Sequence, residues 1–131
     1  MRTAASASLS AGFWRTAALT MAWEALPVGV YGLFQGVALW GTLLTVVGLA
    51  ALGVALSTPV IQWAQARRSS RPLATLLIVS FTASAIIEVW FAARPLPLYV
   101  APKAAVLVHG LILLALTALT AWQLMRSRYA K

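Results

Sequence analysis

The chain has 131 residues, of which 62% are hydrophobic and only 9% are charged. A soluble domain carries about 25% charged residues, so this chain has too few polar side chains to cover a water-facing surface. Ten Lys and Arg residues stand against two acidic residues, the formal net charge is +8, and Cys is absent. These values exclude a soluble enzyme, a disordered tail and a disulfide-stabilised scaffold.

Four apolar segments follow one another along the chain, each long enough to cross a membrane as a helix. The sequence Phe34-Gln35-Gly36 separates the first two, a polar and basic stretch from Gln62 to Pro72 predicts a loop, and Arg94 to Pro97 ends the third. The predicted spans are residues 13–34, 37–58, 73–93 and 104–125. We therefore predict an all-α integral membrane protein, with residues 1–131 forming one antiparallel bundle of four transmembrane helices.

The first span resembles the hydrophobic part of a signal peptide, because basic residues precede it. It contains Glu24, however, and no clear small-x-small cleavage site follows it. We therefore expect a permanent helix.

The distribution of Lys and Arg predicts the orientation. With four spans, the two termini and the central loop share one side of the membrane, which then carries eight of the ten basic residues. The other side carries Arg94 and Lys103. The positive-inside rule places both termini in the cytoplasm, in a plasma membrane of the bacterial inner-membrane type. The residues on the cytoplasmic side are Arg2, Arg15, Arg67, Arg68, Arg71, Arg126, Arg128 and Lys131.

The positive charge is better explained by lipid than by nucleic acid. The basic residues are spread over helix ends rather than gathered on one water-facing surface, so no nucleic-acid partner is expected. Anionic headgroups attract such residues by about 1 kcal/mol each. An acidic partner protein at Arg67, Arg68 and Arg71 is a less favoured alternative. The residues assigned to headgroup contact and topology are Arg67, Arg68, Arg71, Arg126 and Arg128.

Glu24 lies near the middle of the first span, where an ionised acid costs about 2.5–3.5 kcal/mol. It shares a helical stripe with Thr16, Thr20, Tyr31 and Gln35. Pro27 lies on the same stripe, and its missing N–H leaves the carbonyl of Trp23 without a helical donor. One interpretation is structural: a protonated Glu24 bonds to a neighbouring helix or to a freed carbonyl. The other is a proton, cation or substrate site, whose candidate residues are Glu24, Thr20, Tyr31 and Trp23.

Glu88 and His109 are placed symmetrically about the connector between the third and fourth spans. In an antiparallel hairpin both lie about six residues, or ~9 Å, below the outer surface. We therefore predict a hydrogen-bonded or ionic pair between them. Ser80 and Ser84 extend the stripe of Glu88, whereas Thr117, Thr120 and Gln123 extend that of His109, so we expect the two stripes to face each other. A structural clip between two helices is favoured over a proton relay.

The second span carries a face of mostly small residues, which allows another helix to approach closely. That surface packs either within the bundle or against another subunit. Its residues are Gly41, Thr45, Gly48 and Ala55.

Known catalytic and cofactor motifs are missing from the sequence. It contains no Asp, Gly-rich phosphate loop, nucleophile elbow or zinc-binding HExxH, so we expect no enzyme, no metal and no bound cofactor. The favoured function is an accessory or structural subunit that packs in a larger membrane complex or self-associates. The first alternative is a small oligomeric proton-coupled transporter or channel with Glu24 as coupling carboxylate. A weaker alternative is a haem- or quinone-associated anchor that uses His109.

The general plan of four short helices with Glu24 inside the first resembles that of the small multidrug-resistance transporters. The resemblance implies the coupling role for Glu24, and it rests on this one residue. Members of that family commonly insert in both orientations, which requires balanced basic residues. The ratio of eight to two in this chain departs from that pattern.

Overall fold

The computed structural model describes residues 9–66, 71–93 and 103–129, and helices make up nearly all of these segments. Four helices are long and apolar enough to cross a membrane. The predicted all-α fold is thereby confirmed for the described residues. The helices are α2 (Ala11–Phe34), α3 (Ala38–Leu56), α4 (Thr58–Ala66), α5 (Arg71–Ala93) and α6 (Lys103–Tyr129).

Local signals set the ends of α2. Ser10 caps its beginning, since the Ser10 hydroxyl accepts a hydrogen bond from the N–H of Phe13 at 3.1 Å. After Phe34 the chain turns at Gly36, whose φ of +83° is accessible to glycine at little cost. The N–H of Val37 then bonds back to the carbonyl of Gly32 at 2.8 Å, as in a Schellman motif. This turn falls at the break that the sequence indicates.

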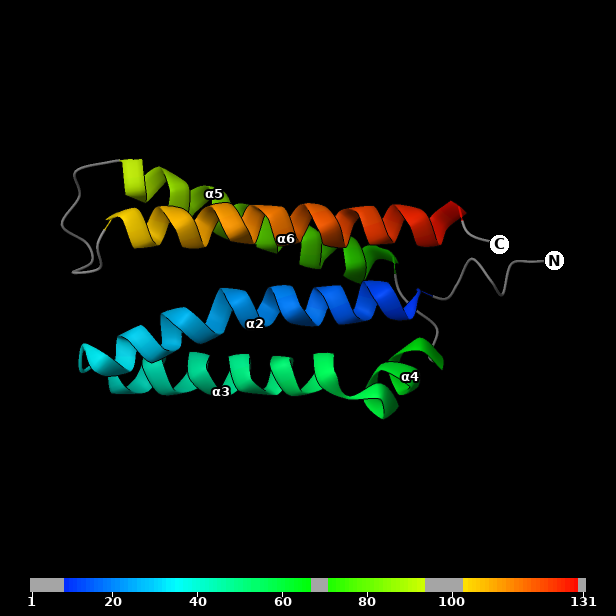
Figure 1. Cartoon of the computed structure of the whole chain (residues 1–131), viewed down its shortest axis with the longest axis horizontal. Coiled ribbons are helices and arrows are strands. Elements are labelled where there is room, and N and C mark those ends of the chain that lie inside the picture. The colour runs from blue at the N-terminus through cyan, green and yellow to red at the C-terminus, as the bar shows by residue number, and fades with distance from the viewer. Residues whose placement is uncertain (1–8, 67–70, 94–102, 130–131) are drawn as a thin grey trace.

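Helix α2 lies in the middle of the molecule, between α3 on one side and α5 and α6 on the other (Figure 1). Successive long helices run in opposite directions, so the start of α2, the short helix α4 and the end of α6 lie at one end (Figure 1). Helix α3 packs mainly on α2, and it also contacts α4. The outer side of α3 is consequently left uncovered by the described part of the chain.

The small residues of α3 pack against α2. Gly41, Gly48 and Ala55 are buried, and a Cβ atom added to Gly48 would lie 2.7 Å from the Cβ of Leu26. A Cβ on Gly29 of α2 would lie 2.4 Å from the backbone nitrogen of Thr45. Such distances mean that the two backbones touch, which only small residues permit. Of the two interpretations of this face, the structure therefore shows packing within the chain.

The expected loop from Gln62 to Pro72 is partly wrong. Residues 62–66 belong to α4 and residues 71–72 to α5, whereas residues 67–70 lie outside the described residues. Helix α3 ends at Leu56, and the Ser57 hydroxyl accepts from the N–H of Val60 at 3.3 Å. Ile61 is buried, and α4 as a whole packs on α2 and α3. A capping hydroxyl and an apolar anchor stabilise this short segment as a helix, although it contains the polar residues Gln62 and Gln65.

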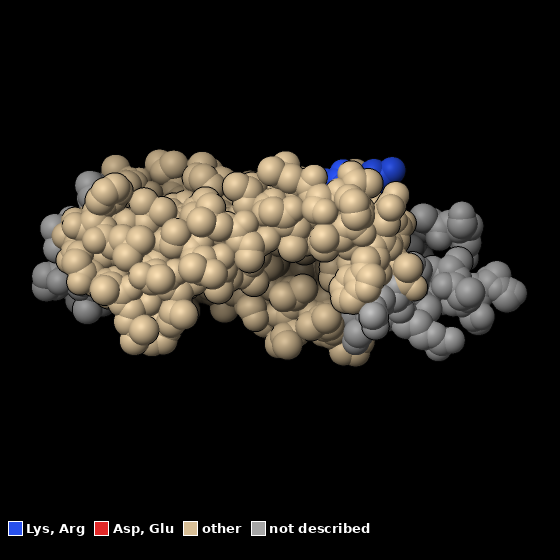
Figure 2. Space-filling model, turned by 90° about the horizontal axis from the view of Figure 1, so that it is seen from below, with Lys and Arg blue, Asp and Glu red and all other residues tan. Residues whose placement is uncertain are grey.

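The exterior is formed largely by apolar side chains. Large residues of α3 and α5 are exposed, among them Leu39 at 67%, Leu76 at 60% and Val79 at 58%. Figure 2 shows one such face, on which Lys and Arg atoms are visible only towards the end where α2 begins and α6 ends. Exposed apolar residues over the length of four long helices suit a surface surrounded by lipid.

Candidate functional site

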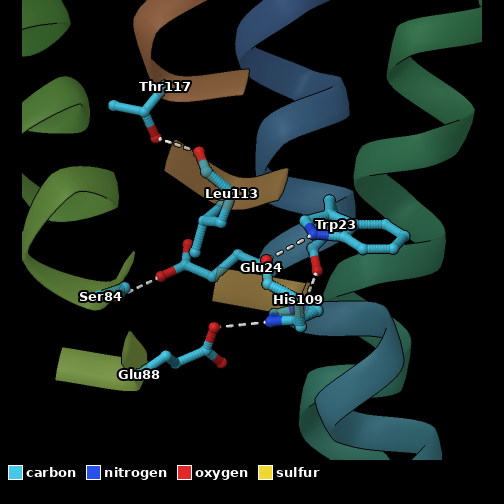
Figure 3. A network of polar contacts seen from close by, with 7 residues as sticks. All are labelled: Trp23, Glu24, Ser84, Glu88, His109, Leu113 and Thr117. Carbon is cyan, nitrogen blue, oxygen red and sulfur yellow. Dashed lines mark hydrogen bonds and ion pairs between the residues drawn. The ribbon is translucent and has the colours of Figure 1, made fainter. Parts of the chain in front are cut away.

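Polar side chains from three helices meet inside the molecule. Glu24 and Trp23 come from α2, Ser84 and Glu88 from α5, and His109 from α6 (Figure 3). The residues that the sequence placed on separate stripes thus belong to one network. We call Trp23, Glu24, Ser84, Glu88 and His109 the polar cluster.

His109 is the centre of this cluster. Its Nδ1 atom lies 2.6 Å from Oε1 of Glu88, which is the pair that the hairpin register predicts. Its Nε2 atom lies 2.7 Å from the backbone carbonyl oxygen of Trp23. The side chain of His109 is 12% exposed and that of Glu88 is 24% exposed. Both ring nitrogens therefore have a partner in a largely dry environment.

Trp23 and His109 contact each other in three ways. The indole Nε1–H of Trp23 donates to the backbone carbonyl of His109 at 3.1 Å, while Nε2 of His109 meets the carbonyl of Trp23. The two rings are also stacked, with centroids 5.1 Å apart and an angle of 20° between their planes. These reciprocal contacts join α2 to α6 at a single level.

Pro27 explains why the carbonyl of Trp23 is available. In a regular helix this oxygen would accept from the N–H of residue 27, but proline has none. A buried carbonyl without a donor is costly, and His109 supplies the donor from another helix. The sequence indicated the free carbonyl, and the partner became visible only in the tertiary structure.

Glu24 contacts α5. The hydroxyl of Ser84 donates to Oε2 of Glu24 at 2.5 Å. This contact joins α2 to α5, a pair of helices that otherwise touch little. Glu24 thus bonds to a neighbouring helix rather than to the freed carbonyl, and Ser84 is the partner that the sequence did not identify. The signal was available, since Ser84 precedes Glu88 by one helical turn.

The other residues proposed beside Glu24 do not join it. Thr20 is fully buried, donates to the carbonyl of Thr16 at 2.8 Å and lies 3.0 Å from the hydroxyl of Thr120. Trp23 stacks on His109 instead. In the part of the chain that is described, no hydrogen bond links Tyr31 to Glu24. The hydrogen bonds and ring contacts of the described residues therefore do not link Thr20, Tyr31 or Trp23 to the carboxylate of Glu24.

The expected facing of two polar stripes is also only partly right. Glu88 meets His109 across α5 and α6, but Thr120 meets Thr20 of α2. Gln123 likewise lies beside α2, because a Cβ on Gly12 would be 2.8 Å from its Oε1 atom. Helix α2 makes polar contacts with both helices of the hairpin, α5 and α6. The sequence could not reveal this third helix.

Of the basic residues assigned to lipid headgroups, Arg126 is described. It is exposed, and its guanidinium carbon lies 4.9 Å from the centre of the Trp122 ring. Arg67 and Arg68 lie outside the described residues. The side chains of Arg71 and Arg128 are outside them as well, although their backbones belong to α5 and α6.

A metal or haem centre finds little support in this geometry. Within the described residues, no group of three His, Cys, Asp or Glu side chains is placed to hold a metal ion. Iron ligation by His109 requires a free ring nitrogen, so either the contact with Glu88 or that with Trp23 would have to break. The contacts of the polar cluster tie three helices together.

No protein-family model matches the sequence, and no curated protein or solved structure is significantly similar to it.

Proposed function

We propose that the protein is a small multi-pass membrane protein that acts as an accessory subunit of a larger membrane complex. The observation that carries the proposal is the position of α3 at the edge of the molecule. It packs mainly on α2 and leaves Trp40, Val46 and Leu49 exposed at 64%, 58% and 54%. An outer helix with an apolar flank offers a surface to helices of a partner.

The polar cluster fits the same role. Its contacts connect α2 with α5, α2 with α6 and α5 with α6, so it fixes the relative positions of three helices. Polar side chains act in this way as attachment points between helices in lipid. We assign no catalytic activity, metal or cofactor to the protein.

Recovery of partners from the native membrane tests the proposal. After purification in mild detergent, we expect unrelated membrane proteins in constant stoichiometry with this chain. Val46→Trp on the outer side of α3 should reduce that recovery, while Ile87→Trp on the exposed side of α5 serves as the matched control. Recovery of the chain alone, or equal recovery with both variants, contradicts the proposed role of α3.

The orientation is part of the proposal. We place the protein in the plasma membrane of a bacterial-type cell with both termini in the cytoplasm, because eight of ten basic residues belong to that side. The chain contains no Cys, so a thiol reagent can label only a cysteine that is introduced by substitution. Gln62→Cys should react with an impermeant thiol reagent only from the cytoplasmic side, and Gln35→Cys only from the outside. The reverse pattern contradicts this orientation.

One observation favours a second candidate, a small oligomeric proton-coupled transporter. Glu24 bonds to Ser84 one turn from the pair of Glu88 and His109, so a carboxylate near the bilayer centre lies beside other titratable groups. In liposomes, Glu24→Gln should then abolish substrate-driven proton movement while the protein remains folded. Purification as a homo-oligomer would favour this candidate over an accessory subunit.

A further inference from the structure

The polar cluster contains the residue types that are rarest in this chain, the acids and the histidine. The chain has only two acidic residues and one histidine, and all three belong to this cluster on α2, α5 and α6. Helices α3 and α4 contain no titratable residue. On α2 itself Arg15 and Tyr31 lie nine and seven residues from Glu24. On α6, Lys103 begins the helix six residues before His109, and Arg126 lies near the other end. The described interior thus provides no Lys or Arg to balance the acids.

The contacts of His109 fix where its protons are. The carbonyl oxygen of Trp23 can only accept, so Nε2 of His109 must carry a hydrogen. One further proton lies between Nδ1 and Oε1 of Glu88. The pair is then either an imidazolium with a carboxylate or an imidazole with a carboxylic acid. Its net charge is zero in both forms.

The carboxyl group of Glu24 is not part of this neutral pair. When it is ionised the cluster carries one uncompensated negative charge, and when it is protonated the cluster is neutral. The Ser84 hydroxyl can donate to a carboxylate or accept from a carboxylic acid, so the same contact serves both states. Reversible proton binding at Glu24 therefore requires no rearrangement of its partner.

We propose that Glu24 is an intramembrane proton-binding site, whose carboxylate takes up and releases one proton while Ser84 remains its hydrogen-bond partner. Uptake forms one O–H bond on the carboxylate, with the proton supplied by water, and no electrons are transferred. The pair of Glu88 and His109 keeps its shared proton and its neutral charge. This site goes beyond the role of the protein as a subunit, and it deepens the transporter candidate, which uses the same carboxylate.

Infrared difference spectroscopy of the purified protein in lipid tests the site directly. Protonated carboxyl groups have a distinct C=O band that shifts in heavy water. We expect a band in the wild type that decreases as the pH rises, that is absent from Glu24→Gln, and that persists in Glu88→Gln. An unchanged band in Glu24→Gln, or a band that does not change with pH, overturns the proposal.

Two further measurements complete the test. Should Glu24→Gln fail to fold, Glu24→Asp replaces it, and the band should then move in frequency rather than vanish; an unmoved band contradicts the assignment. Replacing choline chloride by sodium chloride at constant pH should leave the band unchanged, whereas its loss would assign the site to a metal cation. Partner recovery is measured separately, so failure of the proton site and failure of the proposed subunit role are distinguishable.

Discussion

His109 on α6 donates a hydrogen bond from Nε2 to the carbonyl of Trp23 on α2, at a distance of 2.7 Å. That carbonyl is free because Pro27 lacks the N–H that a regular helix would supply. A proline and a histidine 82 positions apart in the sequence therefore act as one structural unit.

The first prediction concerns the pair of Glu88 and His109. We expect the substitutions Glu88→Gln and His109→Ala to be coupled by about 0.5–3 kcal/mol in a double-mutant cycle, because each removes the partner of the other. The measurement is the free energy of unfolding in mixed micelles. The control is Ser80→Ala combined with His109→Ala, since Ser80 lies on α5, as Glu88 does, but its side chain is exposed. Additive effects for Glu88 and His109 would show that their contact contributes nothing.

The second prediction concerns Pro27. Pro27→Ala restores an N–H that can bond to the carbonyl of Trp23, so this carbonyl no longer depends on His109. The destabilisation caused by His109→Ala should then be smaller in the Pro27→Ala background, by about 1 kcal/mol for one hydrogen bond. Unfolding free energies of the four proteins in this cycle provide the check. An equal cost of His109→Ala in both backgrounds speaks against the compensation.

The third prediction concerns the contact of α3 with α2. Gly48→Ala places a Cβ atom 2.7 Å from the Cβ of Leu26 and 2.8 Å from its backbone, so the helices must separate. We expect a loss of about 1–3 kcal/mol in unfolding free energy. Gly53→Ala on the same helix meets no atom within 4 Å and should be neutral or stabilising by up to about 1 kcal/mol. Similar values for both variants would rule out close packing at Gly48.

The fourth prediction concerns buried hydroxyl groups. Thr20→Val preserves the shape of the side chain but removes its contacts with Thr16 and Thr120. Interhelical hydrogen bonds in membranes contribute about 0.6 kcal/mol on average, and a loss of that order is expected. Thr45→Val is the matched control, since the buried hydroxyl of Thr45 has no hydrogen-bond partner. It should be neutral or stabilising, and thermal unfolding in detergent distinguishes the two variants.

Local patterns in the sequence were sufficient for much of the fold. The turn at Gly36 follows from a residue that tolerates positive φ, and the four long helices follow from apolar length. Helix α4 was missed because its polar residues indicate a loop, while the cap at Ser57 and the burial of Ile61 depend on context. The small-residue face of α3 was identified from spacing alone, but its partner was not.

By itself, the sequence determined that the chain is helical and apolar, and that the titratable residues Glu24, Glu88 and His109 fall within its apolar segments. It also indicated the pair of Glu88 and His109, because residues at equal distances from a short connector come to the same depth in a hairpin. Only the tertiary structure decided that α2 lies against this hairpin, with Ser84 on Glu24 and His109 on the carbonyl of Trp23. Helical periodicity defines the face of each helix, whereas the choice of neighbour depends on packing among all helices at once.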